Sequence, residues 1–203
     1  MTTAPTARED LEHVESTLNK LFKIAIESLR HVEEGLRKGV EVDLTPQVDL
    51  ADHLKETIYT EALFYIAKWQ PLGHELLYVE ALIKASYDLF RITRYANEIA
   101  MTINMARRVV DGELADLTAR ARTMVEKAFR ALLGRDYAEA RGVEELDAAI
   151  DKAYRSELSR IARSEKVDCS DALKLLVLRQ LERIADHATY IAREVLRVVR
   201  ATS

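Results

Sequence analysis

Apolar residues recur at alternating steps of three and four along almost the whole chain. This spacing places them on one face of an α-helix, and only 6 glycines and 3 prolines interrupt the 203 residues. The pattern therefore predicts an all-α fold with six helices. We expect these helices over residues 7–38, 48–69, 72–110, 113–133, 143–165 and 170–200.

The expected helix ends carry residues that suit them. Thr6 and Glu9 have the spacing of a capping box, in which two side chains satisfy free backbone N–H groups at a helix start. Gly39 suits the end of the first helix. Asp168 or Ser170 is the candidate N-cap of the last helix.

The second half of the sequence weakly repeats the first. When Leu89 is aligned with Leu181, five residues of the third helix fall on identical residues of the sixth. These are Arg91, Ile92, Ala96, Ile99 and Ala100, which match Arg183, Ile184, Ala188, Ile191 and Ala192. We expect two three-helix bundles in tandem, residues 1–110 and 111–203, with shallow left-handed helix crossings. A third helix of nearly forty residues would be about 58 Å long, so the molecule is expected to be elongated.

Composition and charge exclude several classes of function. The net charge of −4 does not favour binding to nucleic acid or to an anionic membrane. No stretch of 18 apolar residues is present, so no integral membrane segment is expected. Cys169 is the only cysteine, which excludes a disulfide within the chain and favours a reducing compartment. The N-terminus lacks the pattern of a secretion signal, and we expect a cytoplasmic protein.

Sequence motifs of common enzymes are absent from the chain. It has no G-x-G-x-x-G, Walker A or G-x-S-x-G motif, and no Glu-x-x-His pair of the kind found in di-iron oxidases. Cys169 lies between acidic residues, which disfavour a reactive thiolate. A catalytic role for Cys169 is therefore not expected.

Acidic residues form two pairs with a spacing of four. Glu182 and Asp186 lie on the sixth helix, nearly opposite its apolar face, and are expected to point outward. Asp147 and Asp151 repeat the spacing on the fifth helix. One interpretation is that the acids pair with arginines three residues away. The other is a metal site, because carboxylates bind Mg²⁺, Mn²⁺, Zn²⁺ or iron and a cation would relieve their repulsion. His187, on a flank, is expected to be a packed or surface residue rather than a ligand.

The third helix is apolar on two sides. The side opposite its repeated face carries Leu72, Leu76, Val79, Ile83, Tyr87, Phe90, Met101 and Met105. One interpretation is that this helix lies centrally and that both sides belong to the core. The other is a surface for a homodimer or for a partner protein. Its candidate interface residues are Ile83, Tyr87, Phe90, Met101 and Met105.

Three stretches of the chain resemble a known family. The stretch LERIADHATYIA (181–192) is similar to the signature helix of PhoU proteins, and YDLFRITRYANEIA (87–100) resembles the first signature helix of that family. QPLGHELL (70–77) is similar to its Gln-Pro segment. The resemblance implies a cytoplasmic regulator that represses phosphate uptake when phosphate is plentiful and has no assigned catalytic activity. It also implies as partners the ATPase subunit of the phosphate ABC transporter and a phosphate-sensing histidine kinase.

The resemblance further implies clusters of iron or zinc held by acidic motifs. Glu182 and Asp186 match the family motif directly, and Asp147 matches the acid of the fifth helix, although Val143 stands where an earlier acid is expected. Asp52 matches weakly in the first half.

The first half of the chain departs from the family motif. Phe90 and Arg94 stand where the second half has Glu182 and Asp186. Since arginine does not bind a metal, we expect the first half to have lost its cluster, which leaves at most one site. The alternative functions are a stand-alone metal-binding bundle and a helical scaffold that needs no metal.

Overall fold

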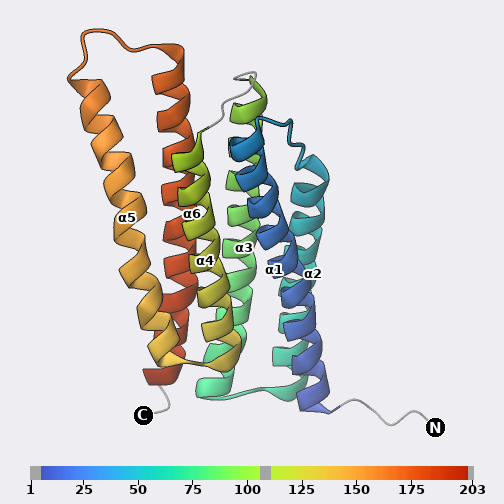
Figure 1. Ribbon diagram of the computed structural model, residues 1–203. Helices are drawn as coiled ribbons and strands as arrows, with labels where there is room; N and C mark the ends of the chain where they lie inside the picture. The colour runs from blue at the N-terminus through green and yellow to red at the C-terminus, as the bar shows by residue number, and fades with distance from the viewer. Residues whose placement is uncertain (1–5, 106–110, 201–203) are drawn as a thin grey trace.

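The computed structural model describes residues 6–105 and 111–200, and the predicted all-α architecture is confirmed in them (Figure 1). Six helices are present: α1 (Ala7–Lys38), α2 (Thr45–Trp69), α3 (His74–Met105), α4 (Gly112–Gly134), α5 (Tyr137–Ala162) and α6 (Cys169–Arg200). They lie roughly parallel or antiparallel in an elongated bundle (Figure 1). None of the helices in the described ranges combines the length and the apolar character that a membrane crossing requires.

Local signals explain most of the helix ends. The capping box at the start of α1 is confirmed, since Thr6 Oγ1 accepts a hydrogen bond from Glu9 N–H and the Glu9 carboxylate accepts one from Thr6 N–H. Asp168 Oδ1 accepts a hydrogen bond from Asp171 N–H at the start of α6, as expected of an N-cap. Gly39 ends α1 in the left-handed conformation.

Two helix starts differ from the prediction by three residues or more. Helix α2 begins at Thr45 rather than at 48, because Pro46 lies in the first turn, where no backbone N–H is needed. Helix α5 begins at Tyr137 rather than at 143, because the side chain of Asp136 caps it by accepting a hydrogen bond from Glu139 N–H. The predicted end of the third helix, at 110, lies outside the described residues.

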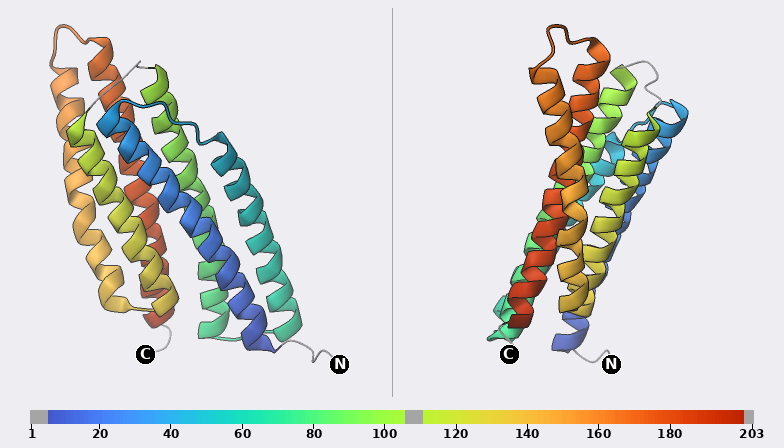
Figure 2. Two further views of the ribbon diagram at one scale, coloured as in Figure 1. Left: turned by 45° about the vertical axis from the view of Figure 1, so that its right-hand side comes forward. Right: turned by 60° about the vertical axis from the view of Figure 1, so that its left-hand side comes forward.

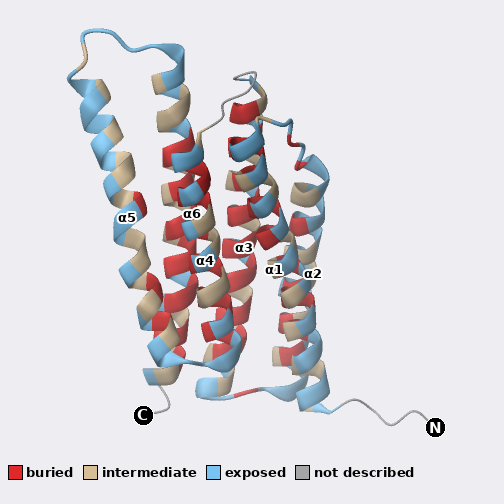
Figure 3. Cartoon of the chain, in the orientation of Figure 1, coloured by how far each residue is buried: buried red, intermediate tan, exposed pale blue. Residues whose placement is uncertain are grey.

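The helices form two groups that share one core. Helices α1, α2 and α3 contact one another, as do α4, α5 and α6; α3 also contacts α6, and α1 contacts α4. In consequence α2 and α5 lie at the two ends of the array (Figure 1; two further views in Figure 2). The buried residues of all six helices belong to one hydrophobic cluster (Figure 3). The division of the chain at residue 110 stays a prediction.

Side chains also join the two groups directly. The rings of Phe22 and Phe129 stack with their centroids 4.0 Å apart, which links α1 to α4. Lys84 Nζ on α3 lies 3.1 Å from Glu194 Oε1 on α6. The groups are therefore parts of one packed body.

The two groups differ at one end. Helix α1 has 32 residues, whereas α4 has 23. The turn between α5 and α6 extends past the start of α4 (Figures 1 and 2). Residues 151–176, which we call the hairpin tip, include no buried residue (Figure 3).

Candidate functional site

The structure brings the acidic pairs of α5 and α6 close to each other. Asp147 and Asp151 lie on α5, Glu182 and Asp186 lie on α6, and their charges affect one another. Burial, followed by the charges of Asp151 and Asp186, raises the pKa of Asp147. Burial, followed by the charge of Asp186, raises the pKa of Glu182. Four carboxylates thus share one partly dehydrated region.

Glu182 and Asp186 are less exposed than expected of side chains that point outward, although neither is buried. Their side chains are only 16% and 27% exposed. A helical wheel identifies the side opposite the apolar face, but it does not show which neighbour covers the flanks. Here α5 packs along α6 and partly covers both carboxylates.

Arginines neutralise three of the four acids. Arg179 Nη1 lies 2.7 Å from Glu182 Oε2, and Arg183 Nη1 lies 3.5 Å from Asp186 Oδ2, so the predicted pairs at a spacing of three form. On α5, Arg155 Nη2 lies 3.0 Å from Asp151 Oδ2. Asp147 differs from the other acids, because its buried Oδ1 has no hydrogen-bond partner among the described residues.

The donor set suits a metal, but the side chains are not gathered around one point. Carboxylate oxygens suit hard or borderline cations, and the unpaired oxygen of Asp147 is a ready ligand. Yet within residues 6–105 and 111–200 no group of three or more His, Cys, Asp or Glu side chains is arranged to hold a metal ion. Binding would require the arginine partners to move away. The metal site therefore stays a prediction.

The first group of helices has a different chemistry in the equivalent place. Ala51 and Ile58 of α2 are buried like Val143 and Ile150 of α5, and the shift of 92 residues is the one that aligns α3 with α6. At this shift the four acids correspond to Lys55, Tyr59, Phe90 and Arg94.

The side chains at these four positions of the first group are cationic or aromatic. Lys55 Nζ lies 4.4 Å from the centroid of the Phe90 ring, a cation–π contact. Asp52 forms an ion pair with Lys55 at 2.6 Å and corresponds in position to Glu144, not to Asp147. Lys55 stands where the second group has Asp147, which supports the expectation that the first group has lost its metal site. The role of Asp52 as a metal ligand stays a prediction.

A buried polar pair between α3 and α6 was not foreseen from the sequence. His187 is buried, as the expectation of a packed residue allowed, and its Nδ1 lies 2.7 Å from Asp88 Oδ1. Burial raises the pKa of Asp88, although the hydrogen bond from His187 lowers it. The one signal for Asp88 was its place beside Ala85 and Leu89 on the apolar face, where a lone acid requires a partner from another helix.

Tyrosines surround this histidine. The ring centroids of Tyr87, Tyr95 and Tyr190 lie 6.4, 5.6 and 5.4 Å from that of His187. Beside them a pocket of about 350 Å³ is lined by both helices. The cluster joins the two groups of helices through buried polar contacts, in addition to the ion pair of Lys84 with Glu194.

The candidate interface residues of α3 fall into two sets. Ile83 and Phe90 are half-buried and pack against the core, which agrees with the interpretation that both sides of α3 are covered. Tyr87, Met101 and Met105 are exposed. A docking surface formed by the exposed set on α3 stays a prediction.

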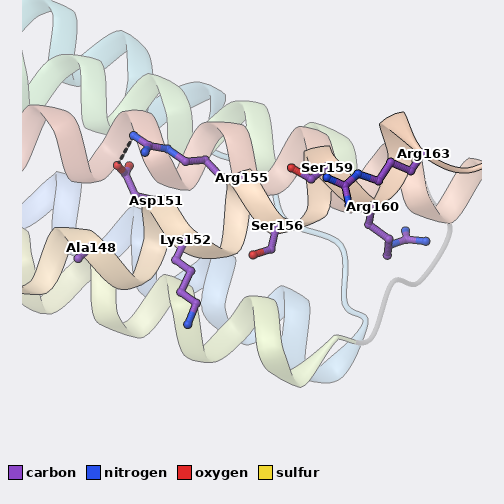
Figure 4. Close-up of a pocket in the computed structure, with 8 residues that line it drawn as sticks. All are labelled: Ala148, Asp151, Lys152, Arg155, Ser156, Ser159, Arg160 and Arg163. Carbon is purple, nitrogen blue, oxygen red and sulfur yellow. Dashed lines mark hydrogen bonds and ion pairs between the residues drawn. The ribbon is translucent and has the colours of Figure 1, made fainter.

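A further depression lies along α5, with a volume of about 670 Å³. Its lining residues are Ala148, Asp151, Lys152, Arg155, Ser156, Ser159, Arg160 and Arg163 (Figure 4). The side chains do not converge: Arg155 turns back to Asp151, and Lys152 points the other way (Figure 4). Because seven of the eight residues lie on α5 and Arg163 is its C-cap, the depression is not shaped like an enclosed active site.

Comparison with known proteins gives one consistent result. Residues 114–195 match the model of the PhoU domain. The chain is 30% identical over 200 residues to a phosphate-specific transport system accessory protein, PhoU homolog 1, of Thermotoga maritima, covering 93% of this chain and 84% of that protein. It is 28% identical to the protein of the same name from Methanothermobacter thermautotrophicus, covering 91% and 87%.

Solved structures agree in fold. The crystal structure of PhoU from Pseudomonas aeruginosa matches with a TM-score of 0.82 at 21% identity, covering 96% of this chain and 99% of that one. The phosphate transport system regulatory protein PhoU from Streptococcus pneumoniae matches with a TM-score of 0.82 at 16% identity, covering 96% and 97%. At these identities the likeness concerns the arrangement of the helices.

Proposed function

The chain belongs to the PhoU family, and on that premise we propose that it is a cytoplasmic negative regulator of phosphate uptake. The observation that carries the proposal is the similarity, over nearly the whole chain, to proteins named as accessory to the phosphate-specific transport system. The regulator acts by binding the ATPase subunit of the phosphate ABC transporter, and a phosphate-sensing histidine kinase is its second proposed partner. It performs no catalysis of its own.

The exposed apolar side chains of α3 support the binding role. Tyr87, Met101 and Met105 lie on one helix and are open to solvent. Aromatic residues and methionine are enriched in protein interfaces. We propose that these three residues contact the ATPase subunit and that the same surface accounts for a homodimer of the free protein.

A direct binding experiment tests the role. The purified ATPase subunit is titrated with the wild-type chain and with Tyr87→Asp/Met101→Asp, and mass is measured by sedimentation equilibrium. We expect the variant to bind at least tenfold more weakly and to be monomeric, with unchanged helicity. Tyr137→Asp, which changes an exposed tyrosine on α5, is the control and should bind normally. A wild-type chain that does not bind the ATPase subunit would overturn the proposal.

We further propose one metal site, in the second group of helices. Asp147, Asp151, Glu182 and Asp186 would hold iron or zinc, or else Mg²⁺ or Mn²⁺. The bound cation would replace the arginines that now pair with three of these acids and would also take up the unpaired oxygen of Asp147. The unpaired Oδ1 of Asp147 and the raised pKa values of Asp147 and Glu182 support the proposal.

Elemental analysis separates the possibilities. Asp186→Ala is expected to lose the metal that wild type retains, while Asp52→Ala in the first group is expected to keep it. Equal metal content in wild type and Asp186→Ala would refute the site, and two clusters per chain would contradict the loss of the first one.

The second candidate function is a metal-binding bundle with no role in phosphate transport. The unpaired buried oxygen of Asp147 is the observation that favours it. Stoichiometric metal in a chain that binds neither the ATPase subunit nor the kinase would establish this alternative.

A further inference from the structure

The first group of helices contains a cation of its own at the place where the second group has Asp147. Lys55 Nζ lies 2.6 Å from Asp52 Oδ1 and 3.0 Å from Glu56 Oε1, both on α2. It also lies 4.4 Å from the centroid of the Phe90 ring on α3, so the ammonium group links the two helices. The hydrogen bond to Asp52 is the largest cause that raises the pKa of Lys55. Lys55 is therefore a charged and partly shielded member of the contact between α2 and α3.

The equivalent contact of the second group has like charges on its two helices. At the shift of 92 residues, Asp147 and Glu182 stand where the first group has the ammonium group and the aromatic ring. Asp151, Glu182 and Asp186 form their ion pairs with arginines of their own helix, so these pairs do not join α5 to α6. Burial, and after it the charges of Asp151 and Asp186, raises the pKa of Asp147. At this place α5 and α6 therefore repel each other, whereas α2 and α3 are linked.

Helix α5 also buries less of its length than α2 does. Its buried residues lie only in its first half, up to Ile150. Helix α2 has buried residues as far as Tyr65, which corresponds to Glu157 of α5. In the second half of α5, Tyr154 lies with its ring centroid 5.4 Å from the guanidinium of Arg179 but is not buried. A segment with so few buried apolar contacts opens at a low cost in free energy.

The ion pairs that join α5 to α6 are partly open to water. Arg160 pairs with Asp171 at the hairpin tip, and the arginine is half-exposed. Near the other end of α5, Arg193 Nε lies 3.6 Å from Glu144 Oε1, and both side chains are exposed. Ion pairs of this kind contribute about 0–1 kcal/mol each. The charges at the acidic contact can therefore decide whether the second half of α5 stays packed on α6.

We propose that Lys55 is a built-in cation that keeps α2 closed against α3, and that α5, where Asp147 replaces it, is the helix that opens and closes. Repulsion among the acids favours local opening of residues 151–162, and a positive charge placed among them favours closing. Helix α5 is then the part of the molecule that responds to a bound cation. The proposal rests on the metal site proposed above only for the identity of that cation.

A charge reversal at Asp147 transfers the chemistry of the first group to the second. In Asp147→Lys, the new ammonium group has Glu144 where Lys55 has Asp52, and it lies among the three remaining acids of the site. Hydrogen exchange is measured by mass spectrometry on the full-length chain, freed of metal with a chelator. We expect the amides of residues 151–162 to exchange at least about tenfold more slowly than in wild type, because opening now separates opposite charges.

Matched variants separate the effect of the cation from other effects. Glu145→Lys makes the same charge reversal at an exposed position of α5 and should leave the exchange unchanged. Asp147→Asn removes a negative charge without adding a positive one, and it should slow the exchange less than Asp147→Lys does. In the first group, Lys55→Gln should speed the exchange of residues 59–69 at least about threefold, because the cation is lost. Circular dichroism checks that all variants are equally helical.

Three outcomes would overturn the proposal. They are equal exchange of residues 151–162 in wild type and Asp147→Lys, equal protection by Asp147→Lys and Asp147→Asn, and unchanged exchange of α2 in Lys55→Gln. The second outcome would show that closing needs no cation, and the third that Lys55 does not hold α2.

A separate measurement distinguishes this proposal from the metal site. Zn²⁺ added to the metal-free wild type should slow the exchange of residues 151–162, and it should have no further effect on Asp147→Lys. If Zn²⁺, iron, Mg²⁺ and Mn²⁺ all fail to bind, the metal site is refuted. The comparison of Asp147→Lys with its control variants contains no metal and still decides whether charge at this position closes α5.

Discussion

Removing the hydroxyl of Tyr78 is expected to destabilise the fold by a predictable amount. Tyr78 is almost fully buried, and its Oη donates a hydrogen bond to Glu15 Oε1 at 2.6 Å, joining α3 to α1. Tyr78→Phe keeps the ring and its contact with the guanidinium of Arg135, which lies 4.0 Å from the ring centroid. Hydrogen bonds to charged groups contribute roughly 1.5–3 kcal/mol.

The lower part of that range applies, because Glu15 is only half-buried and regains water when the bond is lost. We expect the free energy of unfolding to fall by about 1.5 kcal/mol, which for a chain of this size lowers Tm by roughly 3–6 °C. Urea unfolding followed by circular dichroism measures the change. Tyr59→Phe, at an exposed position, is the control.

A double-mutant cycle with Glu15→Ala isolates the contact. We expect the two substitutions to be coupled by roughly 1 kcal/mol or more. If the cycle shows additive effects, or if Tyr78→Phe is as stable as wild type, the start of α1 does not stabilise the α2–α3 hairpin as described.

Three further predictions follow from individual contacts. Leu89→Ala, in the core of α3, should lower the free energy of unfolding by about 2–5 kcal/mol in urea titrations, since Leu89 is fully buried. Asp10→Ala removes a partly exposed contact to Lys68 and should cost less than about 1 kcal/mol in the same assay. Because the pKa of Asp88 is raised above its ordinary 3.8, stability contributed by its protonated form is present below that value and is lost as pH rises through the folded pKa. Asp88→Asn should therefore show a smaller loss of stability than wild type as the pH rises above about 4, measured by urea unfolding at a series of pH values.

The periodic apolar pattern was sufficient to predict the helices, because it reports the face that each helix buries. Helix starts were predicted where a local cap was recognised, as at Thr6, and were missed where a cap such as Asp136 was overlooked. Contacts between helices were harder to predict from the sequence. The pairing of Asp88 with His187 spans 99 positions, and no local spacing records it.

The candidate site shows the same limit. The sequence identified the acids of α5 and α6, and the predicted arginine partners of the two α6 acids at a spacing of three are present. It did not show that α5 covers Glu182 and Asp186, because cover depends on how two helices pack. Nor did it show that Lys55 stands in the place of Asp147, since that match becomes clear only when buried positions are compared.

The stack of Phe22 on Phe129 and the contacts of α3 with α6 have a consequence for how the molecule responds to dilution. Two separate three-helix chains that met through such surfaces would form a dimer, and that dimer would dissociate as its concentration fell. Here one polypeptide carries both surfaces, so they meet at an effective concentration on the order of millimolar whatever the protein concentration. The contact between the two groups of helices is thereby made independent of how many copies of the protein a cell contains.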